Sequence, residues 1–394
     1  MKIKKVGVII QNYVQFESFF PAIELMNQKK INVDILLPTI DMSEHIWDQM
    51  YEKTKEYFEK NGQRIKKGVQ PKIKYDILFA THDLEEFKNQ DREYYIKFRY
   101  GISTKPRYSL TLRKNNPFDL ILSYGTKDSE TLRNFGKVYE IGNIKYANYD
   151  YKPNTKEKQK KSVILYLPTY GDTNSCDIVI PVLSKLSNKY DIRIKLHHGT
   201  NYLLNEEEQT LKRIVNQKFN KIYDSSESLL NIMKDVDLII SDNSGAIGDA
   251  IAAKVPVVIV PKNGKFEKYG EYTTIQEELV EKKLVGVAYN QNEIEKAIKK
   301  ELSDSKLYKK LENAFKMLYS VENENTTDKF SNLLNEIENG LISKDYALIR
   351  RNMQQEYSNF VKMNEDYEVK IEVLNERLKN AYKIIERLEK NNGR

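Results

Sequence analysis

The stretch that decides the fold runs from Asp237 to Val260 and reads DLIISDNSGAIGDAIAAKVPVVIV. The apolar run DLIIS predicts a buried strand, SGAIGDAIAA predicts a helix of small residues, and VPVVIV predicts a second strand. A strand, a helix and a strand in this order place two parallel strands in one sheet with the helix on its face. The polar turn between the first strand and the helix is therefore expected at the carboxyl edge of a parallel sheet.

Similar alternation surrounds this unit in the second half of the chain. Residues 163–170, 192–198 and 221–224 have the length and apolar content of strands. Helical patterns separate them at about 178–189, 205–217 and 226–235. The pattern predicts a doubly wound, Rossmann-like α/β domain over residues 162–340.

The first part of the chain repeats the same pattern. Strand, helix and strand are predicted at 4–11, 16–30 and 31–39, followed by a charge-rich helical region at 47–67. Further short strands are predicted in the segments 75–83, 93–101, 118–126 and 136–143, with a helix at 127–135. We expect a second Rossmann-like domain over residues 1–152, joined by the charged linker DYKPNTKEKQKKS, and a ligand-binding cleft between the two domains.

Composition limits the function classes. The chain has 394 residues, 40% hydrophobic and 31% charged, with a net charge of +7. One cysteine and four scattered histidines predict neither a disulfide framework nor a metal site. The apolar run near the N-terminus is too short for a signal peptide, and no stretch approaches the roughly 18 apolar residues of a membrane span.

We therefore expect a cytoplasmic protein. Its positive charge suits phosphate-bearing partners or peripheral contact with the acidic inner face of the membrane, although a lysine-rich solvated surface explains the charge equally simply. No nucleic-acid-binding module is recognisable, and no nucleic-acid partner is expected.

The last part of the chain, residues 345–392, predicts a coiled coil through which the protein forms a homo-oligomer. The alternative is one long helix lying on its own domain. Two core positions of a heptad repeat are occupied by Tyr357, Asn364, Ile371, Leu378 and Ile385, and by Met353, Phe360, Tyr367, Leu374, Ala381 and Leu388.

The turn after the predicted strand DLIIS suits an anion. Ser241, Asn243, Ser244 and Gly245 are small, so phosphate oxygens can approach the backbone N–H groups at the start of the helix. Asp249, one helical turn further on, suits a ribose hydroxyl pair. The alternative is that Ser244 or Asp242 only caps the helix.

The stretch SDNSGAIGD, residues 241–249, resembles the SDYSSxxxD signature of the CDP-glycerol glycerophosphotransferase family, the teichoic acid and capsule polymerases with a GT-B fold. ILYLPTYGD at 164–172 resembles the family's ILYAPTYRD, and KLH at 195–197 resembles KLHP. IGN at 141–143 resembles the GNPR turn. These motifs follow the family order, and the resemblance covers about residues 90 to 335.

The resemblance implies a GT-B fold and a role for each matching residue. His197 matches the histidine beside the donor phosphates, where an imidazole stabilises the charge on the leaving nucleotide. No metal or cofactor is implied, because the nucleotide-activated donor, such as CDP-glycerol, is itself the substrate. The residues implied to bind the donor are Ser241, Asp242, Asn243, Ser244, Gly245, Asp249 and Thr169.

The sequence departs from the family pattern in the first domain. Where the family has WHGTPLK, with a histidine as general base, this chain has RYGISTK, so Tyr100 stands at the histidine position. A tyrosine of ordinary pKa, about 10, is a poor base at neutral pH. His82 ends a predicted strand in the same domain and is a candidate substitute base, the alternative being a structural histidine. Lys105 keeps the family lysine and could hold an acceptor phosphate, or be only a surface lysine; Gly171 replaces the arginine of PTYRD.

His197 and His198 are neighbours on a predicted strand. Because successive side chains of a regular strand point to opposite faces, we expect only one of them to enter the cleft, and no metal pair.

Three functions are compatible with these residues. The first is a transferase that moves a polyol-phosphate or sugar(-phosphate) group from a CDP-linked donor to a hydroxyl on a phosphate-containing polymer or lipid-linked acceptor. The second is a UDP-sugar glycosyltransferase or an enzyme like UDP-N-acetylglucosamine 2-epimerase, whose SDSGG turn also resembles residues 241–245. The third is a non-catalytic GT-B scaffold of a polymerase complex, which the replaced histidine keeps open.

Overall fold

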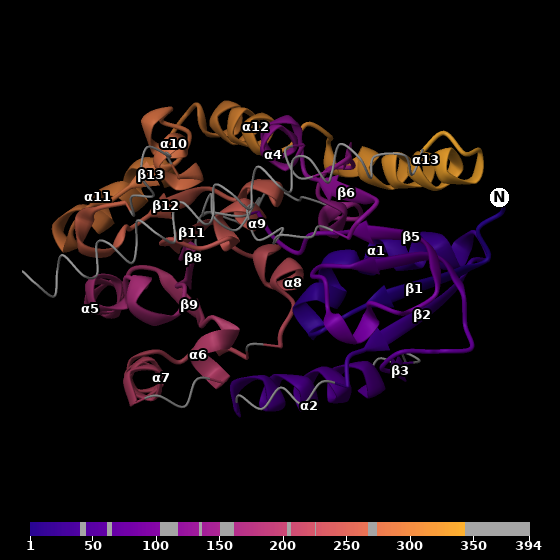
Figure 1. Ribbon diagram of the computed structural model, residues 1–394. Helices are drawn as coiled ribbons and strands as arrows, with labels where there is room; N and C mark the ends of the chain where they lie inside the picture. Colours follow the sequence, from indigo (N-terminus) through magenta and orange to yellow (C-terminus); the bar gives the residue numbers. More distant parts are fainter. Residues whose placement is uncertain are drawn as a thin grey trace, which may run out of the picture.

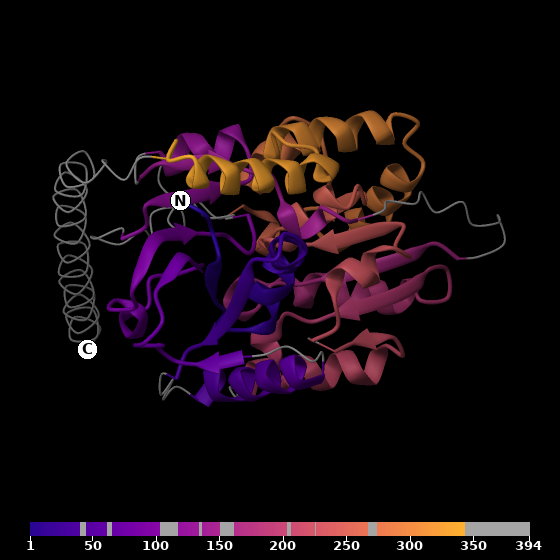
Figure 2. The ribbon, with the colours of Figure 1, turned by 90° about the vertical axis from the view of Figure 1, so that its right-hand side faces the viewer.

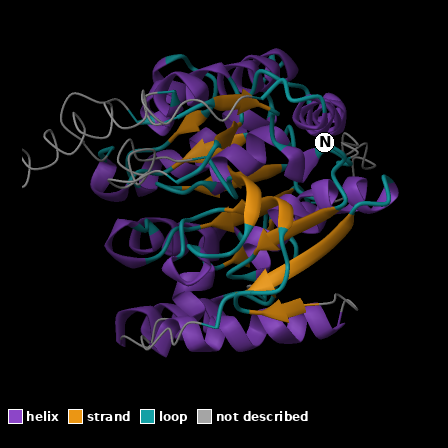
Figure 3. Cartoon of the chain, turned by 45° about the vertical axis from the view of Figure 1, so that its right-hand side comes forward, coloured by secondary structure: helices purple, strands orange, loops and turns teal. Residues whose placement is uncertain are grey.

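The computed structural model describes residues 1–39, 45–60, 65–102, 117–133, 136–149, 161–202, 206–224, 226–266 and 274–342. They form two α/β domains side by side, each built on one parallel sheet (Figure 1). Figure 3 shows the strands lying between layers of helices. Lys105, residues 150–160 of the expected linker and the expected coiled coil at 345–392 fall outside the described residues.

The N-terminal sheet has seven strands in the order β3-β2-β1-β4-β5-β6-β7, and all its pairings are parallel. The strand order reverses direction between β1 and β4, the kind of position at which ligands bind open α/β sheets. The strands are β1 (Lys5–Ile9), β2 (Asn32–Leu37), β3 (Ile65–Lys67), β4 (Tyr75–Ala80), β5 (Arg92–Lys97), β6 (Leu120–Ser123) and β7 (Val138–Glu140).

Helices cover both faces of this sheet. The first begins where the Asn12 side chain accepts a hydrogen bond from the N–H of Gln15, a standard N-cap. The helical region expected at 47–67 ends at Lys60, and Ile65–Lys67 instead pairs with β2 as an edge strand, because strand pairing overrides local helix preference. The elements are α1 (Tyr13–Gln28), α2 (His45–Lys60), η1 (Glu85–Phe87), α4 (Thr126–Leu132) and η2 (Ile144–Tyr146).

The C-terminal sheet has six parallel strands in the order β10-β9-β8-β11-β12-β13, and its order reverses between β8 and β11. The predicted strand, helix and strand of residues 237–260 are confirmed as β11, α9 and β12, with β11 and β12 parallel. The strands are β8 (Val163–Leu167), β9 (Asp191–Lys195), β10 (Ile222–Tyr223), β11 (Leu238–Ser241), β12 (Val257–Ile259) and β13 (Gly286–Val287).

The helices of the second half pack around this sheet, except for the last one. They are α5 (Cys176–Leu186), α6 (His198–Tyr202), α7 (Glu206–Lys218), α8 (Leu229–Met233), α9 (Ala246–Ala252), α10 (Ile275–Glu281), α11 (Gln291–Leu302), α12 (Leu307–Leu318) and α13 (Thr326–Glu338), with the short turns η3 (Gly171–Thr173), η4 (Lys262–Gly264) and η5 (Asn323–Asn325).

Helix α13 returns to the first domain (Figure 2). Its Phe330 is fully buried and meets the rings of Phe19 and Phe79 at centroid distances of 5.7 and 5.8 Å. The Tyr94 hydroxyl donates to the Ile342 carbonyl at 3.0 Å. The expected second domain, residues 162–340, contains this helix along the sequence, but in space the helix completes the core of the first domain.

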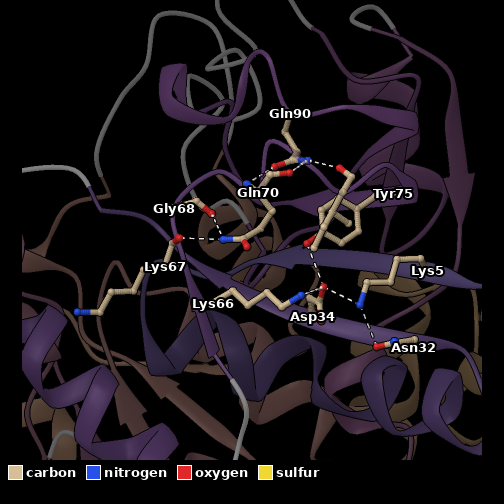
Figure 4. A network of polar contacts seen from close by, with 10 residues as sticks. Lys5, Asn32, Asp34, Lys66, Lys67, Gly68, Gln70, Tyr75 and Gln90 are labelled. Carbon is tan, nitrogen blue, oxygen red and sulfur yellow. Dashed lines mark hydrogen bonds and ion pairs between the residues drawn. The ribbon is translucent and has the colours of Figure 1, made fainter.

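A buried carboxylate joins four strands of the first sheet (Figure 4). Asp34 on β2 receives the ammonium groups of Lys5 and Lys66, each at 2.7 Å from the same oxygen, and the Tyr75 hydroxyl at 3.0 Å. Desolvation raises the pKa of Asp34, but these hydrogen bonds outweigh it and leave the pKa below its usual value. The ionised Asp34 therefore stabilises the edge of the domain.

We expect Asp34→Asn to lower the free energy of unfolding by about 2 kcal/mol, because two ammonium groups then face each other without a counter-charge. Since the folded pKa of Asp34 is depressed, its contribution is present above the unfolded value of about 3.9 and is lost as pH falls through the folded value. The difference in free energy of unfolding between wild type and Asp34→Asn, measured by urea titration, should therefore be smaller at pH 3 than at pH 7. The exposed pair Glu85–Lys88 provides the control, since Glu85→Ala should cost under about 0.5 kcal/mol. An equal effect of both substitutions would contradict the role of Asp34.

Candidate functional site

A cleft of about 680 Å³ separates the two domains at the carboxyl ends of both sheets. The first domain contributes α1, the loops after β4 and β5, and η2; the second contributes the loops after β8, β9 and β11. Among the residues predicted from sequence, the cleft lining contains His82, Tyr100, Thr169, His197, Asn243, Ser244, Gly245 and Asp249.

Ser241 and Asp242 do not line this cleft. The Ser241 hydroxyl donates to the Leu167 carbonyl at 2.7 Å, and both residues are fully buried. The Asp242 carboxylate accepts the N–H groups of Thr169 at 2.9 Å and Ser175 at 3.0 Å, and the Ser175 hydroxyl at 3.2 Å. These two side chains hold the turn after β11 against the turn after β8, and Asp242 also lines a second, smaller cavity behind this turn.

The next three residues, Asn243, Ser244 and Gly245, face the cleft. The Ser244 Oγ accepts the N–H of Ala246 at 3.2 Å, which caps α9 from within the turn. Within the described part of the chain, the N–H groups of Ser244 and Gly245 donate to no protein acceptor. Small side chains and free amides together leave room and donors for an anion.

A smaller cavity of about 210 Å³ lies behind this turn and shares Asn243 and Thr173 with the cleft. Pro261, Lys262 and Phe266, from the loop after β12, close its other side.

His197 and His198 both line the cleft, so the expectation that only one could enter it is wrong. Strand β9 ends at Lys195 and α6 begins at His198, so the alternation of a regular strand does not reach the pair. The two rings lie 4.0 Å apart between centroids, and Tyr170 stacks on His197 at 4.6 Å.

The tautomer of His197 follows from its hydrogen bond. Its Nδ1 accepts the N–H of Gly199 at 2.9 Å. Burial, His198 and Lys195 hold the pKa of His197 well below its ordinary value, so the ring is neutral at pH 7 and its proton is on Nε2. His197 thus offers one N–H donor to the cleft.

His82 and Tyr100 approach each other across the first-domain side, with ring centroids 6.1 Å apart. The Nδ1 of His82 lies 3.0 Å from Gln11 Oε1 and 2.9 Å from Thr81 Oγ1. Because Gln11 Oε1 also accepts from Gln15 Nε2, His82 Nδ1 carries the proton towards it and Nε2 is left as the acceptor. Desolvation and the nearby Lys97 lower the pKa of His82 to about 4.

Positive groups border the cleft from both domains. Lys97 on β5 and Lys195 on β9 reach it, and burial lowers their pKa values to about 7 and about 8. The Lys97 ammonium donates to the Thr81 carbonyl at 2.5 Å and the Lys195 ammonium to the Asp224 carbonyl at 3.1 Å. An anion bound between them would favour the protonated form of both.

Asp249 is held by the first domain. Its Oδ1 accepts the ammonium of Lys145 at 3.1 Å and the hydroxyl of Tyr146 at 2.9 Å, both from η2. Lys145 is buried, and although burial lowers its pKa, Asp249 and Glu17 raise it above the ordinary value. This contact fixes α9 against the first domain.

The domain interface beside this contact is tightly packed. A Cβ added at Gly125 would lie 2.6 Å from the backbone nitrogen of Ser320, and one at Gly248 would lie 3.2 Å from the Tyr319 hydroxyl. That hydroxyl donates to the Gly248 carbonyl at 2.9 Å and accepts from the Asn143 side chain at 3.4 Å. Asn143 of the predicted IGN turn therefore serves the interface.

Several solved structures resemble this chain in fold. The wall teichoic acid polymerase TagF matches with a TM-score of 0.57 and 14% identity, over 86% of this chain and 90% of that chain. A UDP-N-acetylglucosamine 2-epimerase matches with a TM-score of 0.56 and 13% identity, over 86% of this chain and 97% of that chain. The complex of S. aureus MnaA with UDP gives 0.52 and 15%, over the same shares. The fold is GT-B.

At these identities the likeness shows the fold alone. No protein-family model matches the sequence, and no curated protein matches it. The expected GT-B arrangement of two Rossmann-like domains is thus confirmed for the described residues, while the activity is a separate question.

Sequence reasoning missed Glu17, Lys145, Lys195 and Tyr170 as cleft residues. Glu17 gave one signal, a carboxylate inside the aromatic run FESFF of a predicted helix, and Lys145 is the second residue after the IGN turn. Among the described residues, no group of three or more His, Cys, Asp or Glu could hold a metal ion, and none of the helices is long and apolar enough to cross a bilayer.

Proposed function

We propose that this chain is a GT-B transferase that moves a polyol-phosphate or sugar(-phosphate) group from a CDP-linked donor to a hydroxyl acceptor during synthesis of a teichoic acid or capsule-like polymer. The observation that carries this proposal is that the turn after β11, the His197 turn after β9 and the Tyr100 loop of the opposite domain line one cleft. The motif resemblance supports the donor type, and the likeness to TagF supports the fold that such a reaction needs.

The donor phosphates are placed on the second domain. The free N–H groups of Ser244 and Gly245, the Nε2–H of His197 and the Lys195 ammonium would surround a diphosphate from different directions. The Asp249 oxygen that does not contact Lys145 would receive a ribose hydroxyl, and the small cavity behind Asn243 gives room for the rest of the nucleoside. These donors neutralise the leaving nucleotide without requiring a bound metal.

The reaction is a displacement at phosphorus when a polyol phosphate is transferred. The acceptor oxygen forms a bond to the β-phosphorus, and the bond from that phosphorus to the bridging oxygen breaks. CMP leaves with the electron pair, and the acceptor proton passes to a base of the first domain. His197 acts on the leaving side, where its neutral imidazole donates a hydrogen bond to the phosphate oxygen that gains charge.

The acceptor is placed on the first domain. Tyr100 and His82 would contact the phosphate-containing polymer or lipid-linked acceptor, and Lys105 is proposed to hold one of its phosphates. An acceptor of this kind brings the enzyme to the inner face of the membrane, where the net charge of +7 favours peripheral contact. Oligomerisation through residues 345–392 is part of the same proposal.

The likeness to a UDP-N-acetylglucosamine 2-epimerase favours a second candidate, an enzyme that uses a UDP-sugar. TagF has been solved after soaking with CDPG and MnaA with UDP, so structures of this fold accommodate different nucleotides. Comparison of CDP with UDP therefore tests which nucleobase this chain binds.

Thermal shift measurements with CDP and UDP test the proposal directly. We expect CDP to raise the melting temperature by more than UDP does at equal concentration. A ligand that binds only the folded state stabilises it in proportion to ln(1 + [L]/Kd), so the tighter-binding nucleotide gives the larger shift. Ser244→Ala should weaken CDP binding at least about tenfold in calorimetry, since it removes the hydroxyl, which accepts the N–H of Ala246 and whose proton can be donated to a charged phosphate. Ser303→Ala, at the exposed end of α11, is the matched control.

Each other outcome selects an alternative. Equal shifts with CDP and UDP would contradict the cytidine assignment and leave the UDP-sugar enzyme. No shift with either nucleotide, together with no release of CMP from CDP-glycerol, would support the non-catalytic scaffold.

A further inference from the structure

Glu17 is a carboxylate of helix α1 that lines the cleft from the first domain. Its side chain is 18% exposed, and its Oε2 lies 4.0 Å from the Lys145 ammonium. Its other oxygen, Oε1, is buried and has no hydrogen-bond partner among the described residues. A buried carboxylate oxygen without a donor is unfavourable for stability, so its presence at a cleft requires an explanation.

The Lys145 ammonium is shared unequally between two carboxylates and makes no hydrogen bond to Glu17. Lys145 lies between two carboxylates, at 3.1 Å from Asp249 and 4.0 Å from Glu17. The Tyr146 hydroxyl also donates to Asp249, so among the described residues Asp249 receives two donors at hydrogen-bond distance and Glu17 receives none. The cluster therefore carries two negative charges and one positive charge, and the missing donor belongs at Glu17.

We propose that Glu17 is the general base that takes the proton of the acceptor hydroxyl. This assignment rests on the transferase function proposed above. The acceptor O–H would donate to the Glu17 carboxylate from the cleft that Glu17 lines, and a rotation about the terminal torsion of the side chain exchanges the two oxygens. As the acceptor oxygen forms its bond to the β-phosphorus and CMP leaves, the proton moves to the carboxylate.

The position of Glu17 in the fold suits this role. The hydroxyl of Ser18, the next residue on α1, donates to the Val14 carbonyl at 2.8 Å and lies 3.3 Å from the Tyr100 carbonyl, so α1 and the acceptor-side loop are in contact. On the opposite side of the cleft, the charge of Glu17 acts on Lys195, whose pKa it raises against the effect of burial. Glu17, the Tyr100 loop and Lys195 therefore line the same cleft.

Lys145 is a positioning residue for this base. Its ammonium is close enough to orient the Glu17 carboxylate but is engaged at shorter distance by Asp249. The alternative base, His82, is held through its Nδ1 by Thr81 and Gln11, at 2.9 and 3.0 Å. The Glu17 carboxylate lines the same cleft, and its Oε1 accepts no hydrogen bond among the described residues.

The test uses the full-length protein with CDP-glycerol as donor and glycerol 3-phosphate as soluble acceptor probe, with CMP release as the readout. We expect Glu17→Gln to lower kcat by about 10² to 10⁴-fold while the Kd for CDP changes less than about twofold.

Chemical rescue separates a base from a structural role. Glu17→Ala leaves space that formate can enter. Added formate should raise the rate of Glu17→Ala by at least about tenfold and should leave the wild-type rate unchanged. Glu24→Gln, on the same helix but outside the cleft, is the matched control and should retain wild-type kcat.

The outcomes distinguish the two proposals. Glu17→Gln with more than half of the wild-type kcat, or Glu17→Ala without formate rescue, would overturn the assignment of the base and leave the transferase intact. No CMP release and no CDP binding by wild type would overturn the proposed function, and the role of Glu17 with it.

Discussion

Lys145→Met should lower the free energy of unfolding by about 3 to 5 kcal/mol and the melting temperature by about 10 °C. Lys145 is buried at the domain interface, and its ammonium lies 3.1 Å from Asp249 and 4.0 Å from Glu17. Methionine keeps the length of the side chain, so the loss arises because two carboxylates remain buried without their cation. Calorimetry and urea titration of the purified variant measure it.

A double-mutant cycle attributes this loss to the ion pair. Lys145→Met combined with Asp249→Asn should recover at least about half of the lost stability, because the uncompensated charge on α9 is gone. Lys282→Met is the control, since Lys282 contacts Glu278 at 2.8 Å but is 57% exposed, and its loss should cost under about 1 kcal/mol. If the double variant is no more stable than Lys145→Met, the ion pair does not hold the domains together.

The pH dependence of this contribution has a definite sign. The folded pKa of Lys145 is raised above its unfolded value of about 10.4. The contribution of the ammonium is therefore fully present below that value and is lost as pH rises through the folded pKa. The difference between wild type and Lys145→Met should be constant from pH 6 to pH 9 and should shrink only in more alkaline solution.

Asp242→Ala should be about as damaging, with a loss of about 4 kcal/mol in the free energy of unfolding and no thermal shift with CDP. The substitution leaves the N–H groups of Thr169 and Ser175 and the Ser175 hydroxyl buried without their acceptor. Because these contacts join the turns after β8 and β11, their loss also displaces the amides of Ser244 and Gly245. Denaturant titration and thermal shift assays measure both effects.

Asp242→Asn is the matched control because it keeps the shape but places an NH₂ group against one of the donors. It should cost only about 1 to 2 kcal/mol and keep a reduced CDP response. A normal CDP response in Asp242→Ala would show that the turn does not depend on this carboxylate.

The raised pKa of the buried Asp242 carboxyl also makes the free energy of unfolding depend on pH. Burial raises its folded pKa to about 7, above an unfolded value of about 3.9, so between these values the folded state binds more protons than the unfolded state. The contribution of Asp242 to stability therefore decreases as pH rises from 4 to 7. Comparison of wild type with Asp242→Asn across this window should show that trend only in wild type.

Most of the fold was predictable because its signals are local. The apolar runs of β8, β11 and β12 are bounded by polar turns, and the small residues of α9 pack directly on these strands, so periodicity alone indicates a parallel sheet. The predicted turn between β11 and α9 lies at the carboxyl edge of the sheet, as expected. The strand Ile65–Lys67 was not predictable, because it depends on the free edge of β2.

The candidate site was predictable only in part. Ser241, Asp242, Ser244 and Gly245 form one turn in sequence, but the backbone directs the first two side chains into the protein and leaves the other two at the cleft. His197 and His198 both reach the cleft because β9 ends before them. Side-chain direction at a strand end depends on where regular pairing stops, which the residue types do not encode.

By itself, the sequence determined the two parallel sheets and the place of the polar turn, because these follow from hydrophobic period and turn chemistry within short windows. Only the tertiary structure decided that α13 completes the first core and that Glu17, Lys145 and Asp249 meet. The last of these residues is separated from the first by more than half of the chain, and two domains must close on each other before their charges interact. Such contacts depend on the docking of surfaces, and no local pattern of residues records them.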